Sequence, residues 1–151
     1  IYGASGTSGS IALQFAKHLQ AEVTGVCGPS HIPFIQELGA DKTLDYTNDS
    51  AIGNLETYDL VLDCVGKARS SPLKEACKKA LTTRGKYRSI DDAALLLDSS
   101  RLDRIRTLIE MGQIKPINDR CYVLDQIVEA HQYVELGHKK GNVAITVSQS
   151  T

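Results

Sequence analysis

Apolar and polar positions follow two alternating periods along the chain, one typical of strands and one typical of helices. Short apolar runs predict strands at Ile1–Gly3, Glu22–Cys27, Lys42–Tyr46, Asp59–Val65, Lys86–Ile90, Ala94–Leu97 and Asn142–Val147. Apolar residues three or four positions apart predict helices at Ser8–Leu19, His31–Leu38, Ser71–Leu81, Ser100–Met111 and Leu124–Leu136. Strands that alternate with helices over short connections predict βαβ units. We therefore expect an α/β fold, a doubly wound parallel sheet with helices on both faces.

Residue choices within these segments support the same interpretation. The run Asp59–Val65 contains only two charged residues, which is typical of a parallel strand that is covered on both faces. Pro33 stands in the first turn of the predicted helix His31–Leu38 and Gly39 follows its end, where these residue types commonly begin and stop a helix.

The stretch GASGTSG joins the first predicted strand to the first predicted helix. Its Ala4-x-Gly6-x-x-Gly9 frame is a degenerate form of the dinucleotide-binding pattern, with Ala4 in the first glycine place. At Gly6 a Cβ would obstruct a pyrophosphate that approaches the main chain, and Gly9 would let the helix pack closely on the strand. The helix N-terminus, at Thr7 and Ser8, offers free N–H donors and a partial positive charge. A tight turn without a ligand is the alternative, but the surrounding βαβ unit favours a Rossmann-type cofactor site.

Composition excludes several other classes. Seventeen basic and eighteen acidic residues give a net charge of −1, which predicts no general attraction to nucleic acid or to a lipid surface. No apolar run approaches the roughly 18–20 residues of a membrane helix. Cys27, Cys64, Cys77 and Cys121 lack a C-x-x-C spacing and nearby histidines, so we expect free thiols in a cytoplasmic protein rather than a metal site or disulfides. Neither a P-loop nor the Tyr-x-x-x-Lys pair of short-chain dehydrogenases is present.

The end of the second predicted strand favours NADP(H) over NAD(H). An NAD site usually carries an acidic residue there for the ribose 2′-hydroxyl, but no acid lies between Val23 and Gln36. Ser30 would donate to a 2′-phosphate, His31 would add partial positive charge, and Tyr46 would close the adenosine side. No Lys or Arg lies near this strand end, and helix capping on a solvated turn is the alternative role of Ser30 and His31.

Several blocks in the same order resemble the medium-chain dehydrogenase/reductase superfamily, most closely its zinc-independent quinone oxidoreductase-like branch. These blocks are GASGTSG, LGADKTLDY, YDLVLDCVG, GKYRSI, LIEMGQIKPINDR and EAHQYVELGHKKGNVAITV. The resemblance implies that residues 1–151 are an NAD(P)-binding Rossmann domain with a returning tail from about residue 118. It also implies that the N-terminal GroES-like catalytic domain is absent from this chain, which is expected to be inactive alone.

The resemblance also assigns site residues. Gly6 to Gly9 would cradle the pyrophosphate, and Ser30 and Tyr46 would face the adenosine 2′-phosphate. Cys64, Val65 and Gly66 would lie against the adenine-side ribose and the route to the nicotinamide, which Ser89 and Ile90 would flank. The connection after Asp92 is shorter than in the family, and Asn142 replaces the usual lysine after a glycine.

The implied reaction is hydride transfer from NADPH to a quinone, an enone or a related small carbonyl substrate. We expect no catalytic acid and no metal ligand in these residues, because His18 and His131 lie in helical patterns and Asp91-Asp92 in a turn. A zinc-dependent alcohol dehydrogenase and a non-catalytic nucleotide-sensing or scaffold protein remain alternatives. The apolar run Ala94–Leu97 predicts either an edge strand that forms a homodimer or an internally packed strand.

Overall fold

The computed structural model describes residues 1–92 and 98–147 of the 151-residue chain. The helices are α1 Thr7–His18, α2 Ile32–Glu37, α3 Pro72–Lys79, α4 Ser99–Glu110 and α5 Ile127–Glu135. The strands are β1 Thr24–Cys27, β2 Lys42–Asp45, β3 Tyr58–Asp63, β4 Leu81–Ser89, β5 Asn118–Val123 and β6 Asn142–Thr146. Short 3₁₀ helices lie at η1 Pro29–His31, η2 Asp49–Asn54, η3 Gly66–Ala68 and η4 Leu124–Gln126. The expected strand Ala94–Leu97 falls outside the described residues.

The first four strands are parallel, and their order is that of a Rossmann half. β1 pairs with β2 and β3 pairs with β4. Tyr2 joins the two pairs through parallel bridges to Val26 of β1 and Asp63 of β3. The order across the sheet is therefore β2, β1, Tyr2, β3 and β4, which confirms the predicted α/β fold. Because all these strands run the same way, their carboxyl ends lie at one edge of the sheet.

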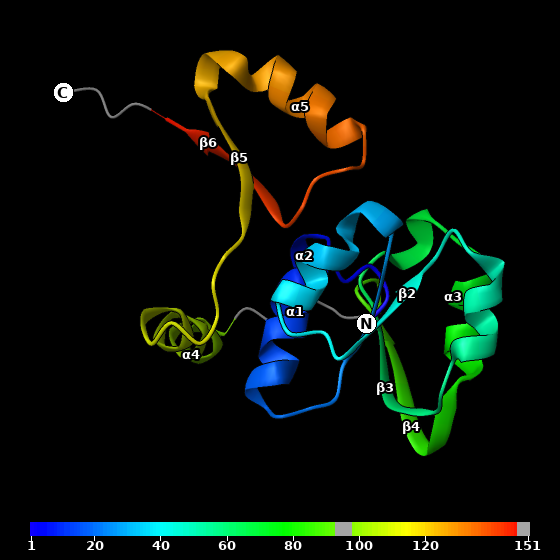
Figure 1. Cartoon of the computed structure of the whole chain (residues 1–151). Helices are drawn as coiled ribbons and strands as arrows, with labels where there is room; N and C mark the ends of the chain where they lie inside the picture. Colours follow the sequence, from blue (N-terminus) through cyan, green and yellow to red (C-terminus); the bar gives the residue numbers. More distant parts are fainter. Residues whose placement is uncertain (93–97, 148–151) are drawn as a thin grey trace.

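Helices cover both faces of this sheet through two separate hydrophobic clusters. One cluster joins the strands to α3 and η2, and consists of Tyr2, Val26, Leu44, Ala51, Val61, Leu73 and Cys77. The other joins them to α1 and α2, and consists of Ala4, Leu13, Val23, Cys27 and Ile35. The neighbours Val26 and Cys27 belong to different clusters because successive side chains of a strand point to opposite faces. Figure 1 shows α3 lying along β3 and β4.

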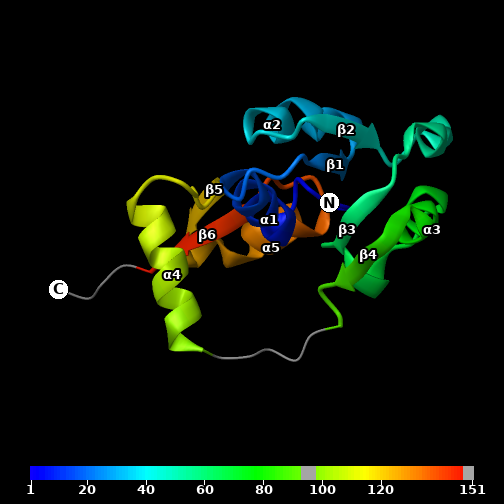
Figure 2. The same cartoon turned by 90° about the horizontal axis from the view of Figure 1, so that it is seen from below.

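The last part of the chain contains a strand that the sequence pattern did not predict. β5 pairs in parallel with β6, and α5 connects them. The segment Asn-Asp-Arg-Cys-Tyr-Val is half polar and is largely exposed, so it carries no apolar signal of a strand. These elements form a small unit beside the four-strand sheet (Figure 1). Figure 2 shows α4 and α3 on opposite sides of the molecule.

Some element boundaries differ from the expected ones, and others agree with them. The strand predicted at Ile1–Gly3 is reduced to the bridge at Tyr2. β4 begins at Leu81 instead of Lys86, and its pairing shifts register between Tyr58 and Leu60. Pro33 and Gly39 hold their predicted places at the two ends of α2. No helix among the described residues is long and apolar enough to span a bilayer.

Candidate functional site

The first turn of α1 presents three main-chain donors that find no acceptor within the described part of the chain. Gly6 is the N-cap residue of α1, and no side chain caps the helix. The first N–H group that bonds back into the helix is that of Ser10, which donates to the Gly6 carbonyl at 2.9 Å. Among the described residues, the N–H groups of Thr7, Ser8 and Gly9 find no acceptor. A helix N-terminus with free donors is a site for an anion.

Gly6 and Gly9 are needed for different reasons. A Cβ on Gly9 would lie 2.0 Å from the Gly3 carbonyl oxygen, so only glycine lets α1 approach the preceding chain this closely. A Cβ on Gly6 would meet only the same oxygen at 3.5 Å. The space beyond Gly6 is therefore open, and a side chain there would fill it. The turn thus fits a phosphate-containing group that approaches the main chain.

Ser30 and Tyr46 lie beside this turn, at the ends of two neighbouring strands. Cys27 pairs with Asp45, so β1 and β2 end side by side. Ser30 is exposed within η1. Tyr46 is 41% exposed, and its ring lies against Gly28, where a Cβ would be 3.5 Å from the ring. Both exposed residues therefore stand at the carboxyl edge of the sheet.

His31 has a role that the sequence did not predict. It is buried, and its Nδ1 lies 3.1 Å from the Ser5 Oγ. Its Nε2 lies 3.0 Å from the His138 carbonyl oxygen; since a carbonyl only accepts, Nε2 carries the proton. Both ring nitrogens are therefore engaged within the protein, and the His31 side chain does not cap a helix, although His31 is the N-cap residue of α2. It connects the glycine turn to the last part of the chain.

The loop after β3 lies against the same turn. The Cys64 N–H donates to the Tyr2 carbonyl at 2.9 Å. A Cβ on Gly3 would lie 2.6 Å from Cγ2 of Val65, so the two segments are in close contact. Burial raises the pKa of the Cys64 thiol to about 11, so this thiol is protonated near neutral pH. Gly66 is buried and has a φ of +66°.

Ser89 and Ile90 extend the edge beyond β3. The Ile90 N–H donates to the Asp63 carbonyl at 3.0 Å, so β3 and β4 end side by side at this edge. Ser89 is half-buried and Ile90 is 47% exposed. Asp91 and Asp92 follow in an exposed turn, and the Asp92 carboxylate accepts the Ser89 N–H at 2.9 Å. The structure thus brings the predicted site residues to one edge, apart from the inward-facing His31.

The last part of the chain closes over the glycine turn, which sequence reasoning missed. The Gly141 N–H donates to the Ser5 carbonyl at 3.0 Å, and the Thr7 hydroxyl donates to the Gly141 carbonyl at 2.8 Å. The Lys139 ammonium donates to the Thr7 hydroxyl at 2.7 Å. Partial burial lowers the pKa of Lys139. Lys139 adds a positive charge beside the free donors, and no local signal could have placed it there.

A second feature that the sequence did not reveal is a buried ion pair behind the loop after β3. The Lys74 ammonium lies 2.8 Å from a carboxylate oxygen of Asp63, and both side chains are almost fully buried. They line a hollow of about 350 Å³ together with Gly66, Tyr87 and Ser89. The only sequence signal of this ion pair was the presence of a charged residue, Asp63, at the end of a mostly apolar strand.

A larger hollow of about 590 Å³ lies elsewhere, against Ile1, Phe15, Leu60 and other mostly apolar residues. It includes the residues that begin β1 and β3, at the opposite edge from the free N–H donors. The candidate site is therefore the carboxyl edge, where unpaired donors and polar side chains converge.

A parallel sheet with a glycine turn and free helix donors at its carboxyl edge defines a Rossmann-type α/β domain. A model of the zinc-binding dehydrogenase family matches residues 9–87, and a second model with the same description matches residues 93–145. The chain therefore belongs to this family. The predicted membership of the medium-chain dehydrogenase/reductase superfamily, in its quinone oxidoreductase-like branch, is confirmed.

Individual relatives cover nearly all of this chain. It is 25% identical over 188 residues to the mitochondrial NAD(P)H oxidoreductase RTN4IP1 of Danio rerio, covering 99% of this chain and 49% of that protein. It is 24% identical over 151 residues to the chloroplastic NADPH-dependent alkenal/one oxidoreductase of Arabidopsis thaliana, covering 96% of this chain and 39% of that protein. The chain thus spans about half the length, or less, of these relatives. The first alignment is longer than the chain, so that relative carries residues with no counterpart here.

A solved structure with the same fold is the quinone oxidoreductase from Coxiella burnetii. It superimposes with a TM-score of 0.77 at 19% identity, over 97% of this chain and 51% of that chain. Despite the name of the family, the described residues contain no group of three or more His, Cys, Asp or Glu side chains that could hold a metal ion.

Proposed function

We propose that this chain is the cofactor-binding part of an NADP(H)-dependent oxidoreductase. The observation that carries this proposal is the set of free N–H groups at Thr7, Ser8 and Gly9, next to the open space at Gly6. These donors would hold the pyrophosphate, and the Lys139 ammonium would add charge beside it. The names of the oxidoreductases that the chain resembles support the same proposal.

The strand order gives the cofactor a direction along the edge. The adenosine half would extend over the ends of β1 and β2, towards Ser30 and Tyr46. The nicotinamide half would extend over the ends of β3 and β4, along Val65 and Gly66 towards Ser89 and Ile90. When bound, the cofactor supplies the hydride. The chain's own residues orient it and limit its contact with water.

Ser30 carries the preference for NADP(H). An acidic residue in this region would repel a 2′-phosphate, and none lies between Val23 and Gln36. We expect Ser30→Asp to weaken NADPH binding by roughly tenfold to a hundredfold and to leave NADH binding equal or better. The measurement is a fluorescence titration of both cofactors on the complete protein.

The matched control for this experiment is Thr83→Asp, which adds the same charge at an exposed position in the first half of β4. Equal losses of NADPH affinity in both variants would contradict the assignment of Ser30.

The substrate would be a quinone, an enone or a related carbonyl compound. The resemblance to the quinone oxidoreductase-like branch supports this proposal, as does the name of the alkenal/one oxidoreductase. The proton would come from water or from a group outside these residues, because His18 and His131 are exposed on α1 and α5. Turnover of quinones and enones by the complete protein with NADPH tests this step and separates it from a non-catalytic role.

The description of the family favours a second candidate, a zinc-dependent alcohol dehydrogenase. Its metal would lie outside the residues described here. A metal assay on the complete protein, combined with alcohol oxidation with and without a chelator, distinguishes the two candidates.

A further inference from the structure

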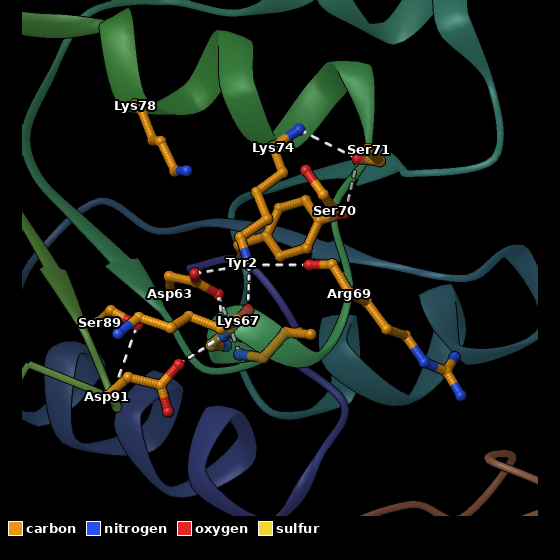
Figure 3. A network of polar contacts seen from close by, with 12 residues as sticks. Tyr2, Asp63, Lys67, Arg69, Ser70, Ser71, Lys74, Lys78, Ser89 and Asp91 are labelled. Atoms are coloured by element: carbon orange, nitrogen blue, oxygen red, sulfur yellow. Dashed lines mark hydrogen bonds and ion pairs between the residues drawn. The ribbon is translucent and has the colours of Figure 1, made fainter.

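The buried ion pair between Asp63 and Lys74 sits behind the loop that follows β3 (Figure 3). Asp63 ends β3 and Lys74 lies in the first turns of α3. The Asp63 side chain is 2% exposed and that of Lys74 is 5% exposed. Both charged groups are therefore almost fully buried beneath the edge of the sheet.

Every polar atom of the pair is used to hold main-chain groups or a neighbouring strand. One carboxylate oxygen of Asp63 accepts the N–H groups of Val65 at 2.9 Å and Gly66 at 3.1 Å. The other accepts the Tyr87 hydroxyl of β4 at 2.7 Å and the Lys74 ammonium at 2.8 Å. Asp63 thus fixes the direction in which the chain leaves β3.

Lys74 holds the far end of the same loop. Its ammonium donates to the carbonyl oxygens of Gly66 and, at 2.9 Å, of Arg69. It also lies 5.8 Å from the centre of the Tyr2 ring, whose hydroxyl is 2.8 Å from the Oγ of Ser71, the N-cap residue of α3. The loop is therefore held by two charged groups that are themselves almost fully buried, and hydrogen bonds to charged groups are stronger in such surroundings.

The loop contacts the glycine turn, since Val65 packs against Gly3. We infer that Asp63 and Lys74 are positioning residues, which hold the Val65–Gly66 backbone where the nicotinamide half of the cofactor passes. This inference rests on the proposed function. The ion pair would act on only one part of the carboxyl edge. The adenosine half of the cofactor would lie over β1 and β2, where the ion pair makes no contact.

The test compares two ligands on the complete protein. NADPH spans the whole edge, whereas 2′,5′-ADP represents only the adenosine half. We expect Lys74→Met to weaken NADPH binding by about tenfold or more. Its affinity for 2′,5′-ADP should stay within about twofold of wild type. A residue that only stabilises the fold would lower both affinities together, or neither.

The matched control is Lys79→Met on the same helix. Lys79 is exposed, and it does not line the hollow beside the ion pair, so both affinities should remain unchanged. If the loss of the buried cation prevents Lys74→Met from folding, Tyr87→Phe answers the question. It removes only one donor to Asp63, and we expect a loss of about threefold that is confined to NADPH.

The outcomes separate this inference from the proposed function. Wild-type protein that binds neither NADPH nor 2′,5′-ADP would refute the proposed function, and the inference would fall with it. Wild-type protein that binds both ligands, with variants that lose both equally or lose neither, would overturn the inference alone.

Discussion

The two glycines of the turn, Gly6 and Gly9, serve different purposes: Gly9 allows close packing, and Gly6 leaves space for a ligand. Gly9 is needed because α1 lies directly on the Gly3 carbonyl. A larger residue at position 9 would therefore destabilise the fold. Gly6 has no such neighbour, and its missing side chain leaves the approach to the free N–H groups open. The two glycines of one motif are therefore distinguishable by experiment.

We expect Gly6→Val to lower NADPH affinity by roughly a hundredfold, because the side chain would occupy the path of the phosphates. The φ of −78° at Gly6 suits valine, so the fold should remain intact. Isothermal titration measures the affinity, and thermal unfolding checks the fold. Gly53→Val in η2 is the control, since nothing lies within 4 Å of a Cβ there. Unchanged affinity in Gly6→Val would show that the phosphates bind elsewhere.

Among the elements, β3, α3 and β4 depend on one another through a single buried charge pair. Burial by itself raises the pKa of Asp63. Hydrogen bonds from Lys74, Tyr87 and two N–H groups outweigh burial, so the pKa of Asp63 lies below its usual range. A carboxyl with a lowered pKa contributes stability above its unfolded pKa of about 3.9, and this contribution is lost as the pH falls through the folded value.

We therefore expect Asp63→Asn to reduce the free energy of unfolding by about 3–5 kcal/mol at pH 7, because Lys74 is left buried without its counter-charge. The difference from wild type should shrink below about pH 4, where the carboxyl of the unfolded wild-type chain begins to take up a proton while the folded one is still ionised. Urea unfolding at pH 7 and pH 3 measures both values. Glu56→Gln, which removes an exposed partner of Lys42, should change little at either pH. A difference that is the same at both pH values would contradict this explanation.

Across the whole molecule, the two ends of the described chain meet at the candidate site. Segments more than 130 positions apart are joined by hydrogen bonds between Thr7 and Gly141 and between Lys139 and Thr7. The connection after α5 thereby completes a site whose main-chain donors come from the first residues.

We expect Lys139→Met to weaken NADPH and NADH by the same factor, roughly threefold to tenfold, since the two cofactors share the pyrophosphate. The dependence of affinity on salt should decrease at the same time. Lys140→Met is the control, because Lys140 points to the Phe34 ring and does not contact the turn. A loss for NADPH alone would place Lys139 at the 2′-phosphate instead.

The cytoplasmic location and the homodimer expected from the sequence stay predictions. The names of two relatives place those proteins in mitochondria and in chloroplasts. The edge strand at Ala94–Leu97 lies outside the described residues.

Local patterns were sufficient for the class of the fold and for the glycine turn. Apolar periodicity, the capping residues of α2 and the spacing of Gly6 and Gly9 act over a few positions, so they can be seen in the sequence. The half-polar strand β5 was missed because it is largely exposed and carries no apolar run, so only its pairing with the distant strand β6 identifies it. Long-range packing, in contrast, turned His31 inward towards Ser5 and His138, joined Asp63 to Lys74, and brought Lys139 to Thr7. Contacts between distant segments depend on how the elements pack, and they leave no periodic signal along the chain. For this reason only the tertiary structure shows them.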